Sequence, residues 1–471
     1  MINGAGGIVS AGTISTPGLL DITTRQGGFT QTGGLIAAGT LTSSGGIAGS
    51  ASFTGGVDRI AILGAFSTTG ALTLLDTGTL TVAGPVSNGA ASQLSASAGL
   101  ILAGNITAPA LDLATRSGGV TQTGGVLTLG TLTGQGGIAG GATLASAGNQ
   151  IAAIGSMTVA GGNLVLTDAV SVNLAGTITA PNATITTPGS ITIPGTITTG
   201  TLALSAGGTI IRPANAGRFT IGTLTGNAVT IANFGTAANV TVLGQFVVTG
   251  STLTLANAQP LTVTGPLSAE FIGITATDTI TLSGTINTMG LPVAGQIAST
   301  PGDPGSYFAV TSSGNGTSTI HDLGTLLIQP SANAQTATVR FDLPTNGGTI
   351  VLDNLVGPSA NVILYTRAGG AVSGQIDIGS LTVIGTNGSS LLNGFVAKTT
   401  GPEAAHLAAI KPDPSATYRL NSCPIGSVNC VLIPVAGLPP SNPLRDFFLD
   451  AGRGQSEDDD IALPDVSSRD Y

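Results

Sequence analysis

The chain has 471 residues but no tryptophan, and aromatic residues make up only 3% of it. Charged residues make up 7%, against about 25% in an average domain, and the only lysines are Lys398 and Lys411. A core built on large side chains is therefore excluded, and Val, Ile, Leu and Ala must fill it. Nucleic-acid binding needs clustered Lys and Arg, and the sequence holds no such cluster. We therefore expect no nucleic-acid partner.

Long apolar runs are also missing. No stretch reaches the roughly 18 consecutive apolar residues of a membrane-spanning helix, so we expect no transmembrane segment. Glycine is abundant instead, with 73 residues. Ile, Leu and Val nevertheless remain frequent, whereas disordered chains combine low hydrophobicity with high net charge. The composition therefore indicates a folded chain with an unusual architecture.

An internal repeat explains the glycine. Residues 21–34 read DITTRQGGFTQTGG and residues 112–125 read DLATRSGGVTQTGG. When the sequence is shifted by 91 positions, 20 of the 30 residues from Leu20 to Gly49 are identical. The phrase GTLT occurs in three copies of this long unit, and a degenerate fourth copy follows near the C-terminus. A fixed period of this kind is the signature of a repeat architecture.

A shorter rhythm lies inside the long unit. Residues 176–199 carry isoleucines six or seven positions apart, each flanked by Thr or Ser, with Gly and Pro between the segments. Alternation of polar and apolar residues predicts short strands with one buried face, and Gly and Pro predict turns. Three strands per coil of roughly 19–20 residues predict an all-β fold, a parallel β-helix or β-solenoid, because a single coil cannot bury its own core. The 91-residue unit is then four or five coils, and duplication lengthened the stack.

The sequence predicts three regions. Residues 1–290 form the regular β-helix, and residues 291–400 form an irregular continuation with a loop insertion at 299–318. Residues 401–471 form a C-terminal cap, beginning with a short helix at 402–410, and a largely disordered, Pro-rich acidic tail.

Few residues could carry chemistry. Residues 1–290 contain seven acidic residues and five arginines, all scattered. Several recur with the repeat, which favours a structural role in turns, because a catalytic residue is needed only once. These repeat residues are Asp21, Arg25, Asp112, Arg116 and Arg367. We expect Arg25 and Arg116 to bind carbonyl groups of a neighbouring loop or a facing aspartate.

No catalytic constellation, cofactor motif or metal site is predicted. Two cysteines and two histidines, far apart, lack the spacing of zinc ligands, and a nucleophile-elbow motif is missing. We therefore expect a protein without catalysis. The alternative is a carbohydrate-active β-helix enzyme, a polysaccharide lyase or hydrolase, which would need a cluster of charged side chains on one face.

The repeats resemble a known family. The pattern TRxGGxTQTGG, followed by GTLTGxxGGIAG and NQIAxIG, looks like the passenger repeats of filamentous-haemagglutinin-like adhesins of two-partner secretion, over most of residues 1–395. The resemblance implies a right-handed β-helix and export through an outer-membrane barrel transporter of a Gram-negative bacterium. It also implies a secreted or cell-surface location and attachment to host or abiotic surfaces, with glycans among the candidate ligands.

The two ends of the chain raise separate questions. The start, MINGAGGIVSAGTIS, lacks the basic and apolar regions of a signal peptide. We therefore expect either the C-terminal part of a longer exported protein or a non-exported gene remnant. Cys423 and Cys430 can close a small disulfide loop in an oxidising compartment, two unpaired thiols being the alternative. The resemblance suggests that such a loop tethers the adhesin at its transporter.

Overall fold

The computed structural model describes residues 1–283, apart from single residues 56, 236, 270 and 278, and beyond them the backbone of the strands from residue 286 to residue 433. The chain divides into two units, Met1–Gly222 and Thr223–Tyr471, and each is described by itself. All described elements are β-strands. The predicted all-β fold is therefore confirmed, and the acidic tail lies outside the described residues.

The first unit contains 24 complete strands. They are β1 (Ile2–Gly4), β2 (Ile8–Ser10), β3 (Ile14–Thr24), β4 (Phe29–Gln31), β5 (Ile36–Thr42), β6 (Ala51–Phe53), β7 (Arg59–Leu63), β8 (Phe66–Thr68), β9 (Leu72–Asp76), β10 (Thr79–Val82), β11 (Val86–Asn88), β12 (Ser92–Ala96), β13 (Gly99–Leu102), β14 (Ile106–Thr115), β15 (Val120–Gln122), β16 (Leu127–Ile138), β17 (Ala142–Leu144), β18 (Gln150–Val159), β19 (Asn163–Thr167), β20 (Val172–Leu174), β21 (Thr177–Thr187), β22 (Ile191–Thr192), β23 (Thr196–Ala206) and β24 (Ile210–Ile211). The unit boundary falls within β25 (Phe219–Ala228).

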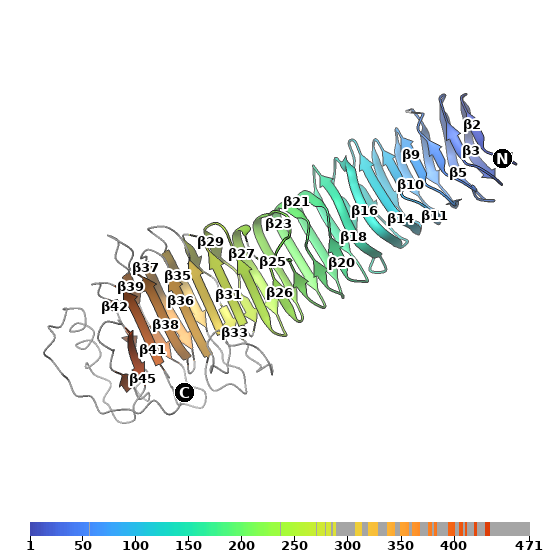
Figure 1. The fold of residues 1–471 in the computed structure, drawn as a ribbon. Helices are drawn as coiled ribbons and strands as arrows, with labels where there is room; N and C mark the ends of the chain where they lie inside the picture. The colour runs from blue at the N-terminus through green and yellow to red at the C-terminus, as the bar shows by residue number, and fades with distance from the viewer. Residues whose placement is uncertain are drawn as a thin grey trace. The chain divides into compact units, whose positions relative to one another are not determined.

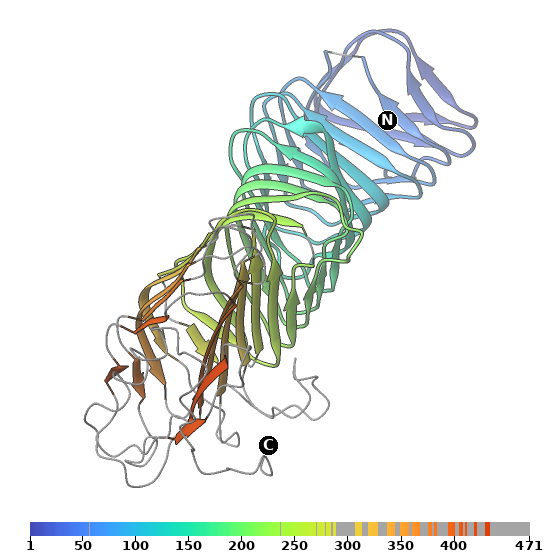
Figure 2. The same ribbon diagram turned by 60° about the vertical axis from the view of Figure 1, so that its left-hand side comes forward.

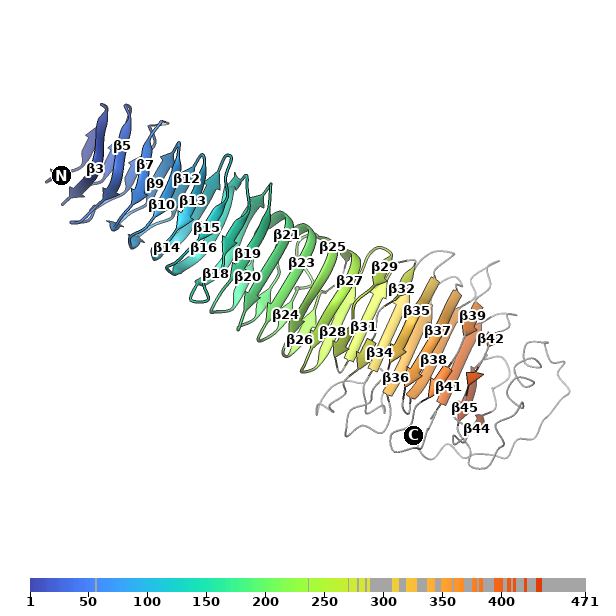
Figure 3. The same cartoon turned by 180° about the vertical axis from the view of Figure 1, so that it is seen from behind.

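The strands of the first unit stack as successive coils of a parallel β-solenoid (Figure 1). Each strand pairs in parallel with the strand one coil on; for example, Ile2 pairs with Ile22 and Thr177 pairs with Thr196. These two steps are 20 and 19 residues long, and the longest strands, such as β14, β16 and β18, lie side by side in Figure 3. The predicted coil length is thus observed.

Inward-facing aliphatic side chains form columns that run from coil to coil. We define a column as the residues that pair from each coil to the next. The column that starts at Leu20 continues through Leu41, Leu63 and Val82 to Leu102. All five side chains are buried. Phenylalanines fill the wider places, and the rings of Phe29 and Phe53 stack with their centroids 4.7 Å apart. Compact inward residues are the reason that the chain needs no tryptophan.

The 91-residue repeat is not a whole number of coils. Leu111 is the counterpart of Leu20, yet four coils on from Leu20 the column has reached Leu102. Leu111 pairs instead with Ser92, in the column that leads back through β9 and β6 to Phe29. The repeat therefore spans about four and a half coils. Its successive copies lie on different sides of the solenoid, because Leu20 and Phe29 belong to different strands of one coil.

The second unit continues with the same type of stacking. Its strands are β26 (Ile231–Asn233), β27 (Ala238–Val248), β28 (Thr252–Ala256), β29 (Leu261–Val263), β30 (Leu267–Ala269), β31 (Phe271–Ala276), β32 (Ile280–Leu282), β33 (Ile286–Thr288), β34 (Tyr307–Ser312), β35 (Thr319–Leu327), β36 (Ala337–Leu343), β37 (Thr349–Gly357), β38 (Ala360–Arg367), β39 (Gln375–Ile378), β40 (Leu381–Val383), β41 (Gly394–Thr400), β42 (Ala405–Leu407), β43 (Ile410–Lys411), β44 (Arg419–Asn421) and β45 (Asn429–Ile433). Figure 2 shows these strands in a turned view.

The coil length of the second unit changes near residue 290. Leu261 pairs with Ile280, 19 residues on, whereas Phe271 pairs with Tyr307, 36 residues on. The predicted irregular continuation is visible in this lengthened step. However, β34 lies inside the segment 299–318, which the sequence predicts as a loop, so for Tyr307–Ser312 that prediction is wrong. Pairing with β31 supplies the strand hydrogen bonds that local sequence does not announce.

The end of the described chain also departs from expectation. The short helix predicted at 402–410 is wrong, because this segment contributes β42 and the start of β43, which pair in parallel with β39 and β40. Stacking on a preceding coil overrides the weak local helix propensity. β45 then pairs antiparallel with β41 and β44 and interrupts the parallel order. Among the described residues, no helix could span a membrane.

Candidate functional site

The duplicated aspartates make the same hydrogen bonds in both copies of the repeat. Asp21 Oδ1 accepts from Thr42 Oγ1 at 3.0 Å and from the Ser44 backbone N–H at 2.7 Å. Asp112 Oδ1 accepts from Thr133 Oγ1 and from the Gln135 backbone N–H, both at 2.8 Å. The partners lie 21 and 23 residues ahead in each case, which is one coil. Both aspartates therefore fasten a turn to the next coil.

A duplicated threonine, which the sequence analysis did not single out, has a similar task. Thr24 Oγ1 donates to the carbonyl of Gly27 at 2.8 Å and accepts from the Ala48 N–H at 3.2 Å. Thr115 Oγ1 makes the equivalent bonds with Gly118 and Ala139. Both threonine side chains are buried. The signal that could have found them is their identity at the 91-residue shift next to turn glycines.

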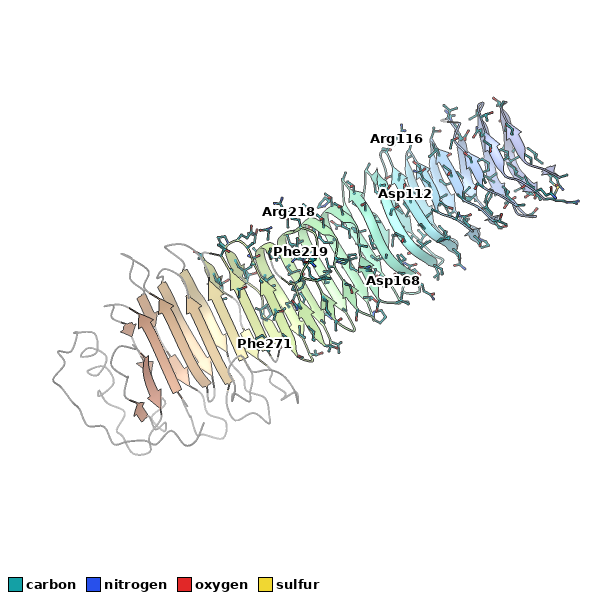
Figure 4. All side chains as sticks on the ribbon, in the orientation of Figure 1. Asp112, Arg116, Asp168, Arg218, Phe219 and Phe271 are labelled. Atoms are coloured by element: carbon teal, nitrogen blue, oxygen red, sulfur yellow. The ribbon has the colours of Figure 1, made fainter. Side chains whose placement is uncertain are left out.

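The duplicated arginines do not behave as predicted. Arg25 and Arg116 are exposed, and within the described residues neither guanidinium makes a hydrogen bond or ion pair. Figure 4 shows Arg116 at the surface of the solenoid. The prediction that they bind loop carbonyls or an aspartate is wrong, because the threonine already satisfies the turn carbonyl and the aspartate already binds the next coil. Only the backbone of Arg367 is described, at the end of β38.

A second set of polar side chains is fully buried at a corner of the coil. Asp58 Oδ1 accepts from Gln31 Nε2 at 2.9 Å and from the Ile36 N–H at 2.8 Å. One repeat later, Asn149 Oδ1 accepts from Gln122 Nε2 at 2.9 Å and from the Leu127 N–H at 3.0 Å. The exposed fraction is 0% for both Asp58 and Asn149. We call these two arrangements the Asp58 corner and the Asn149 corner.

The next corner along the chain is also capped by a buried carboxylate. Asp76 accepts from the backbone N–H groups of Ile60 and Gly78, both at 2.6 Å. Asp168 accepts from those of Ile151 and Val170, both at 2.9 Å. Each oxygen of each carboxylate thus caps one backbone donor.

Burial and hydrogen bonding act in opposite directions on these acids. Burial raises the pKa of Asp76 above its ordinary value, with a further contribution from the negative charge of Asp58. Burial likewise raises the pKa of Asp168. Burial alone would raise the pKa of Asp21 as well, but hydrogen bonds from Ser44 and Thr42 outweigh it and hold that pKa below its ordinary value. The polarity of each corner is therefore balanced by backbone donors.

This arrangement serves the fold rather than an open reaction centre. Asp58, Asp76 and Asp168 are buried and bonded to the backbone, so a dissolved substrate has no access to them. The described residues contain no group of three or more His, Cys, Asp or Glu that could hold a metal ion. In Figure 4, Asp112 and Asp168 lie apart from each other on the solenoid and form no shared cluster.

The predicted cysteine pair cannot be assessed in the same way. Cys430 lies in β45, whose backbone pairs antiparallel with β41, while Cys423 lies outside the described residues. The disulfide therefore stays a prediction. No family model, curated protein or solved structure matches the chain.

Proposed function

We propose that this chain is the structural shaft of a secreted or surface-displayed bacterial adhesin, resembling filamentous-haemagglutinin-like proteins, and that it mediates attachment or biofilm-type contacts without catalysis. One observation carries the proposal: the repeated polar side chains bind the next coil of the solenoid and leave no clustered reactive groups on the described surface. Such a design propagates length, which is the requirement of a shaft.

The proposed partners follow from the same resemblance. An outer-membrane barrel transporter would export the chain as part of a longer protein, and host or abiotic surfaces, including glycans, would be the attachment targets. Contacts along a repetitive shaft are individually weak, so multivalent display would supply the avidity.

The test of the proposed function is an attachment assay with the purified chain. Beads coated with the chain are expected to adhere to epithelial monolayers and to abiotic surfaces more than beads coated with an unrelated protein of similar charge. Soluble chain should compete with this adhesion. Equal adhesion by both bead types would reject the proposal.

A second assay addresses the enzyme alternative. The chain is incubated with a panel of acidic and neutral polysaccharides, and new reducing ends and unsaturated products are measured. We expect neither to accumulate. Product formation that persists after repurification would instead establish a carbohydrate-active β-helix enzyme.

A further inference from the structure

The Asp58 corner differs from the Asn149 corner by one chemical group. Asn149 Nδ2 donates to Gln122 Oε1 at 2.9 Å, to the Thr167 carbonyl at 3.1 Å and to the Leu144 carbonyl at 3.4 Å. This amide group therefore sits in a pocket of oxygen acceptors. Asp58 lies at the same position of the preceding repeat and carries an oxygen where Asn149 carries its NH₂ group.

That oxygen is the unusual atom of the corner. Asp58 Oδ1 has its two donors, whereas Asp58 Oδ2 is buried and makes no hydrogen bond. The equivalents of two acceptors around Asn149 Nδ2 are present, since Gln31 and Phe53 stand where the next repeat has Gln122 and Leu144. An ionised carboxylate has only acceptors. An unpaired, fully buried negative oxygen facing other acceptors is costly.

We propose that the folded chain holds Asp58 as a neutral carboxylic acid whose Oδ2–H donates within the corner, as the amide of Asn149 does. The Asp58 corner is then a proton-dependent latch between neighbouring coils. Folding takes up one proton that the unfolded chain has released near neutral pH. By linkage, the latch is strongest in acid and weakens as the pH rises.

The charges around the corner agree with this assignment. Asp76 is the neighbouring buried carboxyl, and repulsion from Asp58 contributes to its raised pKa. Arg59 is the neighbouring cation, but its side chain is exposed and makes no ion pair within the described residues. One exposed cation near two buried carboxyls leaves an excess of negative charge, which a proton on Asp58 relieves.

The decisive experiment compares the full chain with its Asp58→Asn variant. An infrared difference spectrum at pH 7 is expected to show one protonated carboxylic acid that the variant lacks. The variant should also melt about 2–4 °C higher than the parent at pH 7. This difference should shrink towards zero near the ordinary Asp pKa of about 3.9, because acid supplies the hydrogen that the amide provides.

A matched pair of variants completes the test. Asn149→Asp should acquire the same pH dependence, whereas Asp76→Asn should be destabilised at all pH values, because both oxygens of Asp76 accept backbone N–H groups. An infrared spectrum with only carboxylate at pH 7, or a melting difference independent of pH, would overturn the proposal. So would a loss of stability on chelation, which would assign a bound cation in place of the proton.

Discussion

At the scale of single residues, the few polar side chains of the first unit have a common geometry. Asp21 and Asp112 reach partners 21 and 23 residues ahead, and Thr24 and Thr115 reach an N–H 24 residues ahead. These distances along the chain correspond to one coil. Each side chain therefore reads only the next coil, which is why its task survives although the repeat places its copies on different sides.

A threonine-to-valine pair tests this task. Thr24→Val keeps the shape of the side chain but removes the hydroxyl that binds Gly27 and Ala48. We expect a loss of about 1–2 kcal/mol in the free energy of unfolding, because a buried carbonyl loses its donor. Thr30→Val, at an exposed strand position, should change it by no more than about 0.5 kcal/mol. Chemical denaturation measures both, and equal losses would contradict the assignment.

The pH response of Asp21 has a definite sign. Its folded-state pKa lies below the ordinary value of 3.8, because hydrogen bonds outweigh burial. The ionised carboxylate thus stabilises the fold above that value, and the stabilisation disappears as the pH falls through the lowered pKa. The parent should exceed Asp21→Asn in melting temperature at neutral pH, and the gap should close between about pH 5 and pH 2. A gap that stays constant over this range would refute the prediction.

At the scale of elements, the turns limit the sequence more strictly than the strands do. Gly34 and Gly125 are counterparts with φ of 75° and 63°, and a Cβ on either would lie 2.3 Å from the backbone of Gly12 or Gly104 in the coil below. The second residue of each TQTGG turn therefore needs glycine for two reasons: a left-handed conformation and a close approach between coils.

Two glycine substitutions separate these reasons. Gly137 also has a positive φ, of 80°, but no atom lies within 4 Å of its added Cβ. We expect Gly137→Ala to cost about 1 kcal/mol, from conformation alone, and Gly125→Ala to cost roughly 3 kcal/mol or more, from conformation and collision together. Thermal denaturation of both variants gives the comparison. Similar costs would mean that the coils can separate at Gly125 without penalty.

The sequence predicts the strands because alternating residues such as Thr177, Ile178 and Thr179 report one buried face directly. It misses β34 and β42, because these strands depend on pairing with a preceding coil and not on their own residues. It also misses the buried corners. Asp58 in the sequence looks like a solvated acid, and only the fold reveals that it is enclosed.

At the scale of the whole molecule, each described coil of the first unit contacts mainly its neighbours, so length can change by internal deletion. Removal of residues 21–111 joins Leu20 to Asp112 and deletes one 91-residue repeat. Ile2, which pairs with Ile22, would then meet Leu113, the counterpart of Ile22. We expect a folded, shorter protein with an unchanged β-sheet signal per residue by circular dichroism and a cooperative melt.

The control deletion removes residues 21–106, five fewer at its end. Leu20 then joins Thr107, and strand residues fall against turn residues of the adjoining coil. This protein should aggregate or melt without cooperativity. If both deletions behave alike, the register of the coils does not depend on the repeat.

The half-coil remainder of the repeat has a consequence for crowding. Successive copies of the TRxGG turn lie about 22 Å apart along the solenoid axis, as four and a half coils of roughly 4.8 Å, but they face different directions. A bulky molecule bound to one copy therefore does not shade the next. Stoichiometry of occupancy, rather than steric exclusion, would then set how many antibodies or receptors one shaft can carry.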